Sequence, residues 1–177
     1  MSVGKAYIIT GAPGTGKSTV INALKKSGHA CYDEVARGVI AQELWNGKNR
    51  LPWVDIHGFS ELVLAVMLSQ KKEVLKNQLS FLDRGIPDII GYFNHANVVP
   101  PKKYLDALSN YAYQKKVFFT PVWEEIYVTD TERMETIDEA KRVSESLYDT
   151  YNSLGFELIE LPKISTKERL DFILQKI

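Results

Sequence analysis

Runs of residues that are apolar at every position most constrain how this chain folds. Tyr7-Ile8-Ile9 and Val117-Phe118-Phe119 do not alternate with polar residues. Strands that are apolar on both faces are typical of parallel sheets covered by helices on both sides. The sequence therefore predicts such a sheet, with strands over residues 6–10, 29–33, 78–83, 116–120 and 157–161.

Segments of helical period separate these runs. The longest has apolar or small residues at spacings of three and four between Ile137 and Leu154, and Gly155 follows as a helix-ending glycine. A second helix is expected within residues 57–77, and Ser165-Thr166-Lys167-Glu168 resembles the capped start of a terminal helix. The alternation of strands and helices predicts a doubly wound α/β sheet in a single domain over residues 1–177.

Composition excludes several classes of protein. The 177 residues carry 22 basic and 22 acidic side chains, interleaved along the chain, so a broad surface for nucleic acid is not expected. No apolar run is long enough to span a membrane, and no leader peptide is recognisable. The single cysteine, Cys31, cannot form an internal disulfide, which favours a cytoplasmic location.

The first expected strand leads into a segment that matches G-x-x-x-x-G-K-[ST] at every position, the P-loop pattern. Glycines let the backbone wrap a phosphate closely, and the N–H groups at the start of the next helix point at it. Lys17 is expected to reach the β- and γ-phosphates of a nucleotide, and Ser18 to bind Mg²⁺. The predicted nucleotide-binding residues are Gly11, Ala12, Pro13, Gly14, Thr15, Gly16, Lys17, Ser18 and Thr19.

Charged residues also follow the third expected strand, in Phe81-Leu82-Asp83-Arg84-Gly85-Ile86-Pro87-Asp88. The carboxyl ends of parallel strands share one edge of the sheet, where ligands bind. We expect Asp83 to bind Mg²⁺, directly or through water; the alternative is that it caps the following loop. Arg84 is either a substrate or phosphate contact or a member of a surface ion pair, and Asp88 is a further substrate candidate.

Asp33 and Glu34 end the second expected strand, and Arg37 follows shortly. One of the two carboxylates is placed to accept the proton of a hydroxyl that attacks the γ-phosphate. Glu34 is the preferred general base, Asp33 is its substitute, and Arg37 is a substrate candidate. The alternative is that both carboxylates only stabilise the N-terminus of the next helix.

Residues 121–136 form a long, polar connection and are the candidate for a lid that excludes water from the phosphates. Arg133 is expected to stabilise charge on the transferred phosphoryl group, with Arg142 in reserve; alternatively, each forms salt bridges with nearby glutamates. Trp53 is a candidate for lining the substrate pocket, although an aromatic residue of this kind also suits the core.

Together these residues resemble the small P-loop kinases of the nucleoside and nucleoside-monophosphate type, including the ribosylnicotinamide kinase domain. The chain is also similar to a bacterial family of small AAA-type predicted ATPases, through the segments GAPGTGKST, DEVAR, FLDRGIPD and VFFTPVWEEIYVTDTER.

The kinase resemblance implies a three-layer fold whose five parallel strands have the order 2-3-1-4-5. It also implies a carboxylate base at strand two, an Asp-Arg pair after strand three, an arginine-bearing lid, and a loop at 162–166 near the adenine base. The matching residues here are Glu34, Asp83, Arg84 and Arg133. Kinase lids usually carry several close arginines, whereas the next basic residue here is Lys141.

The leading hypothesis is an ATP- and Mg²⁺-dependent phosphotransferase whose acceptor is a small hydroxyl-bearing metabolite, with nucleoside-like compounds among the candidates. An ATP hydrolase without an organic acceptor and a nucleotide-dependent switch that binds a partner are the alternatives. Motor-type ATPases place Glu after the metal-binding Asp to activate water, and this chain has Arg84 there. The guanine-reading pattern Asn/Thr-Lys-x-Asp does not occur, which favours ATP over GTP.

Overall fold

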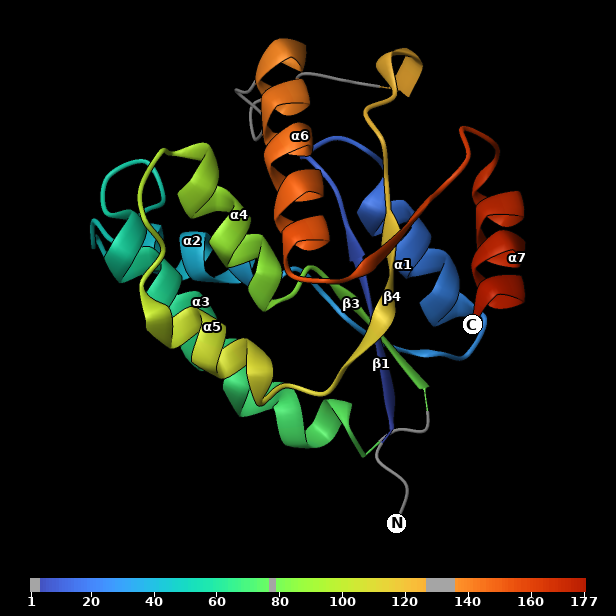
Figure 1. Cartoon of the computed structure of the whole chain (residues 1–177), viewed down its shortest axis with the longest axis horizontal. Helices are drawn as coiled ribbons and strands as arrows, with labels where there is room; N and C mark the ends of the chain where they lie inside the picture. Colours follow the sequence, from blue (N-terminus) through green and yellow to red (C-terminus); the bar gives the residue numbers. More distant parts are fainter. Residues whose placement is uncertain (1–3, 77–78, 127–135) are drawn as a thin grey trace.

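A computed structural model describes residues 4–76, 79–126 and 136–177. Within these residues, five parallel strands form one sheet in the order β2-β3-β1-β4-β5, which confirms the predicted sheet and its order (Figure 1). The strands are β1 (Lys5–Thr10), β2 (Ala30–Tyr32), β3 (Leu79–Asp83), β4 (Tyr113–Phe119) and β5 (Glu157–Glu160). Only β4 begins well outside its expected range, at Tyr113 instead of Lys116.

The central strand β1 explains why its apolar run does not alternate. Ile8 pairs with Leu82 of β3 on one side and with Val117 of β4 on the other. Successive side chains of a strand point to opposite faces, so Tyr7 and Ile9 pack into one apolar cluster while Ile8 packs into another. Both faces of the sheet are therefore buried.

Helices α1 (Lys17–Lys26) and α7 (Thr166–Lys176) cover the first face and pack against each other (Figure 1). Their buried side chains Val20, Ile21, Leu24 and Ile173 join the cluster that contains Tyr7 and Ile9. The predicted start of the terminal helix is confirmed, because the Ser165 hydroxyl accepts from the Glu168 N–H and the Glu168 carboxylate accepts from the Ser165 N–H.

The long apolar period correctly predicted helix α6 (Ile137–Ser153). This helix lies on the opposite face of the sheet and packs against α4 (Ile86–His95). These two helices approach closely, since a Cβ atom on Gly91 of α4 would lie 2.7 Å from Leu147 Cδ2 of α6. Helix α5 (Lys102–Ser109) packs against α4. Its single buried side chain, Tyr104, belongs to the same apolar cluster as Phe93.

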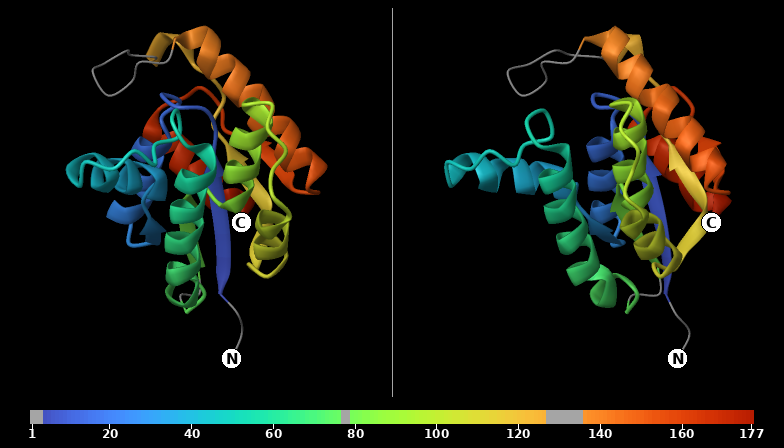
Figure 2. Two further views of the ribbon diagram at one scale, coloured as in Figure 1. Left: turned by 90° about the vertical axis from the view of Figure 1, so that its left-hand side faces the viewer. Right: turned by 60° about the vertical axis from the view of Figure 1, so that its left-hand side comes forward.

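Helices α2 (Val35–Trp45) and α3 (Ile56–Val74) form a pair beside this layer. Figure 2 shows α2 extending away from the sheet before the chain turns back into α3. The expected helix within 57–77 is thus confirmed, with Asp55 as its N-cap, which accepts from the Gly58 N–H at 2.9 Å. No helix among the described residues combines the length and apolar character needed to cross a bilayer.

Candidate active site

The P-loop joins β1 to α1 and is built on left-handed glycines. Gly14 has φ +76° and Gly16, the N-cap of α1, has φ +86°. A residue with a side chain is strained in this region, so the glycines of the motif are required by the backbone conformation. Helix α1 then begins at Lys17, which brings the N–H groups of its first turn to this loop.

The end of β4 braces this loop. Gly11 has φ +141°, and a Cβ atom there would lie 2.3 Å from Thr120 Oγ1. The Thr120 hydroxyl donates to the Thr10 carbonyl at 3.0 Å and lies 2.6 Å from the Thr15 hydroxyl. Through these contacts, Thr120 holds the start of the P-loop against the end of β4.

Lys17 is buried, and its ammonium group donates to the carbonyls of Gly11 at 2.9 Å and Ala12 at 2.7 Å. Burial, together with repulsion from Arg84, lowers the pKa of Lys17 to about 8, although the charges of Asp83 and Glu34 act in the opposite direction. The ammonium group thus lies within a cluster of charges at the edge of the sheet. Negative phosphate oxygens would stabilise its charged form.

Ser18 and Asp83 meet beside Lys17. The Ser18 hydroxyl is 3.5 Å from Asp83 Oδ2, while Asp83 Oδ1 is buried and has no hydrogen-bond partner among the described residues. Burial raises the pKa of Asp83 to about 6, although the charge of Lys17 acts in the opposite direction. A buried carboxylate oxygen without a donor, next to a hydroxyl, matches the oxygen ligands of Mg²⁺.

No cluster of three His, Cys, Asp or Glu side chains able to hold a metal is found within residues 4–76, 79–126 and 136–177. Mg²⁺ does not need such a cage, because it commonly binds through one or two protein oxygens together with phosphates and water. Ser18 and Asp83 therefore fit this ion.

Glu34, at the start of α2, is held by two arginines. Arg84 Nε donates to Glu34 Oε1 at 3.0 Å, and Arg37 Nε donates to Oε2 at 3.2 Å. Burial alone would raise the pKa of the Glu34 carboxyl, but the charges of Arg84, Lys17 and Arg37 outweigh burial and hold the pKa below its ordinary value. Glu34 is therefore an ionised carboxylate fixed beside the P-loop lysine.

Arg84 forms buried ion pairs, not the surface pair that was one of its two interpretations. Its guanidinium is bound to Glu34 on one side and to Asp88 Oδ1 at 3.0 Å on the other. Because both its Nε and Nη1 groups are used in this way, Arg84 joins the end of β3 to the start of α2. Arg84 thus holds the Glu34 carboxylate in position.

Asp88 is buried and accepts four hydrogen bonds, two at each oxygen. The donors are Thr10 Oγ1 at 2.5 Å, Arg84 Nη1 at 3.0 Å, the Gly85 N–H at 2.8 Å and Tyr151 OH at 2.6 Å. A carboxylate has about four acceptor sites, and protein donors use all of them. Asp88 therefore has no acceptor site left for a substrate, although its position after the third strand had made it a substrate candidate.

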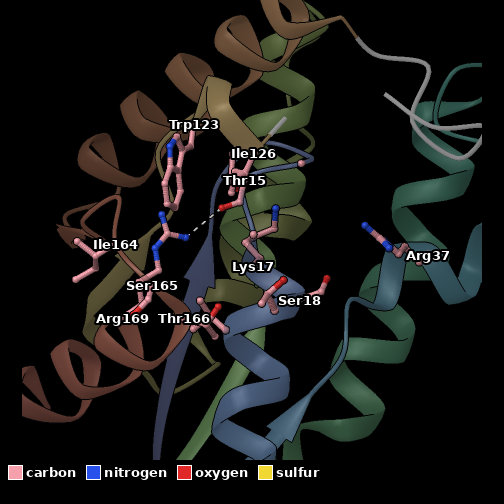
Figure 3. Close-up of a pocket in the computed structure, with 14 residues that line it drawn as sticks. Thr15, Lys17, Ser18, Arg37, Trp123, Ile126, Ile164, Ser165, Thr166 and Arg169 are labelled. Carbon is pink, nitrogen blue, oxygen red and sulfur yellow. Dashed lines mark hydrogen bonds between the residues drawn. The ribbon is translucent and has the colours of Figure 1, made fainter. Parts of the chain in front are cut away.

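A pocket of about 360 Å³ opens from the P-loop (Figure 3). Residues 14–20 form one side of it, and the segment before α6 together with the β5–α7 connection forms another. The lining residues outside the P-loop and α1 are Arg37, Trp123, Ile126, Ile164, Ser165, Thr166 and Arg169. Its size lies within the range of small-ligand sites.

The other predicted site residues lie elsewhere. Asp33 is exposed and bound to Lys25 at 2.6 Å, although it also borders a small cavity next to Asp83. Trp53 is 69% exposed, so it does not belong to the core, and it is not among the residues that line these two cavities. Arg142 pairs with Glu139, as its alternative interpretation predicted. Arg133 and most of the candidate lid at 121–136 lie outside the described residues.

The residues of the site that were not singled out from the sequence include Thr120, Tyr151 and Arg169. Arg169 gave the one usable signal, because it stands four residues before Ile173 on the buried face of α7. A charged side chain on the apolar face of a helix requires a polar partner. No comparable pattern marks Thr120 or Tyr151.

Comparison with known proteins gives a family match and a set of similar folds. The model of a family described as an AAA domain matches residues 6–169. No curated protein gives a significant match to the sequence.

Among solved structures, deoxyadenosine kinase from M. mycoides is 17% identical with a TM-score of 0.70, and the match covers 97% of each chain. Thymidylate kinase from Candida albicans is 15% identical with a TM-score of 0.69, covering 100% of this chain and 92% of that one. Shikimate kinase from Aquifex aeolicus is 16% identical with a TM-score of 0.57, covering 96% and 94%. At these identities the likeness establishes a shared fold, the three-layer fold of P-loop kinases.

Proposed function

The chain belongs to the AAA domain family and has the fold of P-loop kinases, and from this we propose that it is an ATP- and Mg²⁺-dependent phosphotransferase. It transfers the γ-phosphate to a hydroxyl group of a small metabolite, with nucleoside-like acceptors as the first candidates. The similar folds of deoxyadenosine, thymidylate and shikimate kinases favour a small acceptor over a protein one. The lone cysteine, Cys31, keeps the cytoplasm as the proposed compartment.

The main support for this proposal is the position and the ionised form of Glu34. It is an ionised carboxylate whose position is fixed by Arg84 and Arg37 and whose charge acts on Lys17. A general base needs a proton-accepting oxygen near the attacking hydroxyl, and the geometry of such a group comes before its pKa. The residue after Asp83 is Arg84, so the glutamate with which motor-type ATPases activate water is missing from that position.

The proposed reaction assigns a role to each residue. The acceptor oxygen attacks the γ-phosphorus, the bond between that phosphorus and the bridging oxygen of ADP breaks, and the hydroxyl proton passes to Glu34. Lys17 and the P-loop N–H groups bind the phosphate oxygens and stabilise the charge that spreads over them. Ser18 and Asp83 would hold Mg²⁺, which neutralises phosphate charge when bound.

Two further assignments remain proposals. Residues 121–136 act as the lid, and Arg133 within it supplies positive charge to the transferred phosphoryl group. Arg37 lines the pocket. Only its Nε binds Glu34, so this ion pair does not occupy the two terminal nitrogens of the guanidinium. Arg37 is therefore placed to contact either ATP or the acceptor.

The test is ADP release from ATP and Mg²⁺ by the purified chain, with and without pooled nucleosides and other small hydroxyl compounds. We expect one pool to raise the rate at least about tenfold, and Lys17→Ala to abolish that stimulation. A slow rate that no pool changes, equal to the rate of Glu34→Gln, would instead identify an ATP hydrolase. Undiminished activity of Lys17→Ala would refute both assignments.

A further inference from the structure

Arg37 is a cation in the first turn of α2 that lines the pocket at the P-loop. Figure 3 shows its side chain extending from α2 towards the side of the pocket formed by Lys17 and Ser18. Its Nε donates to Glu34 Oε2 at 3.2 Å, and 54% of the side chain is exposed. Among the described residues, Glu34 is the only hydrogen-bond partner of Arg37, so both terminal nitrogens are open to a ligand.

Three cations line this pocket in the described part of the chain, and the other two are bound to backbone carbonyls. Lys17 donates to the carbonyls of Gly11 and Ala12. Arg169 is 3% exposed and donates to two further carbonyls. Arg37 is therefore the cation of this pocket that can bind a ligand through its terminal nitrogens without breaking a contact within the protein.

A cation between Glu34 and the pocket also reduces repulsion between two negative groups. The proposed base is an ionised carboxylate, and the γ-phosphate that the acceptor attacks beside it is negative as well. Like charges at short distance repel each other, whereas a guanidinium has five N–H donors and can bind two anions at once. With Nε on Glu34, the terminal nitrogens of Arg37 remain for phosphate oxygens.

We propose that Arg37 is a catalytic residue that binds the γ-phosphate of ATP through its terminal nitrogens while its Nε holds Glu34. This inference rests on the proposed function, because it requires a nucleotide whose phosphates occupy the P-loop. The bonds that form and break are those of the proposed reaction, and Arg37 neither gains nor loses a proton. It stabilises the charge that spreads over the oxygens of the transferred phosphoryl group, and this role does not depend on Arg133.

The contact between Arg37 and the phosphoryl group strengthens as the reaction proceeds. Glu34 becomes neutral when it takes up the hydroxyl proton, so its ion pair with Arg37 becomes a weaker hydrogen bond. The guanidinium charge then acts more fully on the phosphoryl oxygens. An interaction that strengthens towards the transition state lowers the barrier, so the loss of Arg37 should reduce kcat more than it weakens substrate binding.

Binding measurements isolate the contribution of the γ-phosphate. Isothermal titration with ADP and with β,γ-imido-ATP, both with Mg²⁺, compares nucleotides without and with a γ-phosphate and needs no acceptor. We expect Arg37→Met to raise the Kd for β,γ-imido-ATP about tenfold and to leave the Kd for ADP within about twofold. Arg37→Lys keeps the charge but loses the planar fork, so its Kd for β,γ-imido-ATP should lie between those of the wild type and Arg37→Met.

Kinetics distinguish a contact with the phosphate from a contact with the acceptor. With the pool that stimulates ADP release, Arg37→Met should lower kcat about a hundredfold, while the pool concentration at half-maximal rate stays within about twofold. Lys103→Met is the matched control, since Lys103 is an exposed cation that also pairs with a glutamate, Glu61, and is not among the residues that line either cavity. This control should change none of these values.

The outcomes separate this inference from the proposed function. If Arg37→Met weakens ADP as much as β,γ-imido-ATP, or weakens neither, Arg37 does not bind the γ-phosphate, while the proposed function is unaffected. If only the half-saturating concentration of the acceptor pool rises, Arg37 binds the acceptor and the inference is equally wrong. If the wild type binds neither nucleotide, or if Lys17→Ala leaves both affinities unchanged, the proposed function itself fails and the inference fails with it.

Discussion

Replacing Asp88 by Asn should destabilise the protein strongly while leaving the shape of the side chain almost unchanged. Asp88 accepts four hydrogen bonds, one of them from the buried Arg84 guanidinium at 3.0 Å. The amide of Asn has a single acceptor oxygen, so its NH₂ group must face two of these four donors. Arg84 then keeps only Glu34 as a negative partner.

The expected cost follows from these contacts. Breaking a buried ion pair at one partner typically costs about 3–5 kcal/mol, because the other charge stays buried. With a urea m-value of about 2 kcal/mol/M, a cost of about 4 kcal/mol lowers the midpoint of unfolding by about 2 M. Circular dichroism at the helix band is the suitable probe, because it follows the helices of the whole domain, whereas two of the three tryptophans, Trp45 at 90% and Trp53 at 69%, are already exposed in the folded state.

Two controls define the result. Tyr151→Phe removes one donor to Asp88 and keeps the charge, so it should cost only about 1–2 kcal/mol. Asp106→Asn makes the same chemical change at an exposed carboxylate, 3.9 Å from Lys102, and should cost less than about 1 kcal/mol. A shift for Asp88→Asn below about 0.5 M would refute the view that Asp88 balances the charge of Arg84.

Three further predictions concern the base, the cysteine and the helix interface. Glu34→Gln should lower kcat at least about a hundredfold without changing the Kd for ADP, and an unchanged kcat would remove Glu34 as general base. Burial raises the pKa of Cys31 to about 11, and the thiolate is the reactive form. Alkylation by iodoacetamide should therefore be slow at pH 7.5 and rise about tenfold per pH unit towards pH 11; a plateau near the ordinary thiol pKa of about 8.5 would contradict this. Gly91→Ala should cost about 1–3 kcal/mol by urea unfolding, because its Cβ would meet Leu147 Cδ2 at 2.7 Å, and Leu147→Ala should cost less in that background than in the wild type. Strictly additive costs would show that the two side chains do not compete for this space.

Much of the fold could be predicted from local patterns. The five strands and the P-loop follow from short apolar runs and from glycine spacing, because backbone conformation within a few residues decides both. The order of the strands was implied only by resemblance to kinases. Periodicity identifies which segments are strands but contains no information about which strand lies beside which.

The contacts of the site were beyond sequence reasoning for the same reason. Arg84 meets Glu34 across 50 residues because β3 lies next to β2, and Arg169 reaches Thr15 because α7 packs on α1. Neither contact can be read from the residues around it. Asp88 was assigned to substrate since it follows a strand end, whereas its depth under α6, where Tyr151 binds it, depends on tertiary packing.

The backbone at Arg84 shows how the charge arrangement is maintained. Arg84 has φ +74°, a left-handed conformation that costs a residue with a side chain on the order of 1–2 kcal/mol. Its N–H donates to the Ile9 carbonyl at 3.0 Å, and its guanidinium binds Glu34 and Asp88, so several interactions offset this strain.

The turn that results sends Asp83 towards Ser18 and Arg84 towards Glu34. Five charged side chains lie close together here: the cations Lys17 and Arg84 and the carboxylates Glu34, Asp83 and Asp88. Burial raises the pKa of Asp83 and the neighbouring charge of Glu34 adds to this, so a cation bound at Asp83 would stabilise its ionised form. Under the proposed function, the ion pair between Arg84 and Glu34 would keep the two acidic roles apart, with Asp83 available to the metal and Glu34 to the proton.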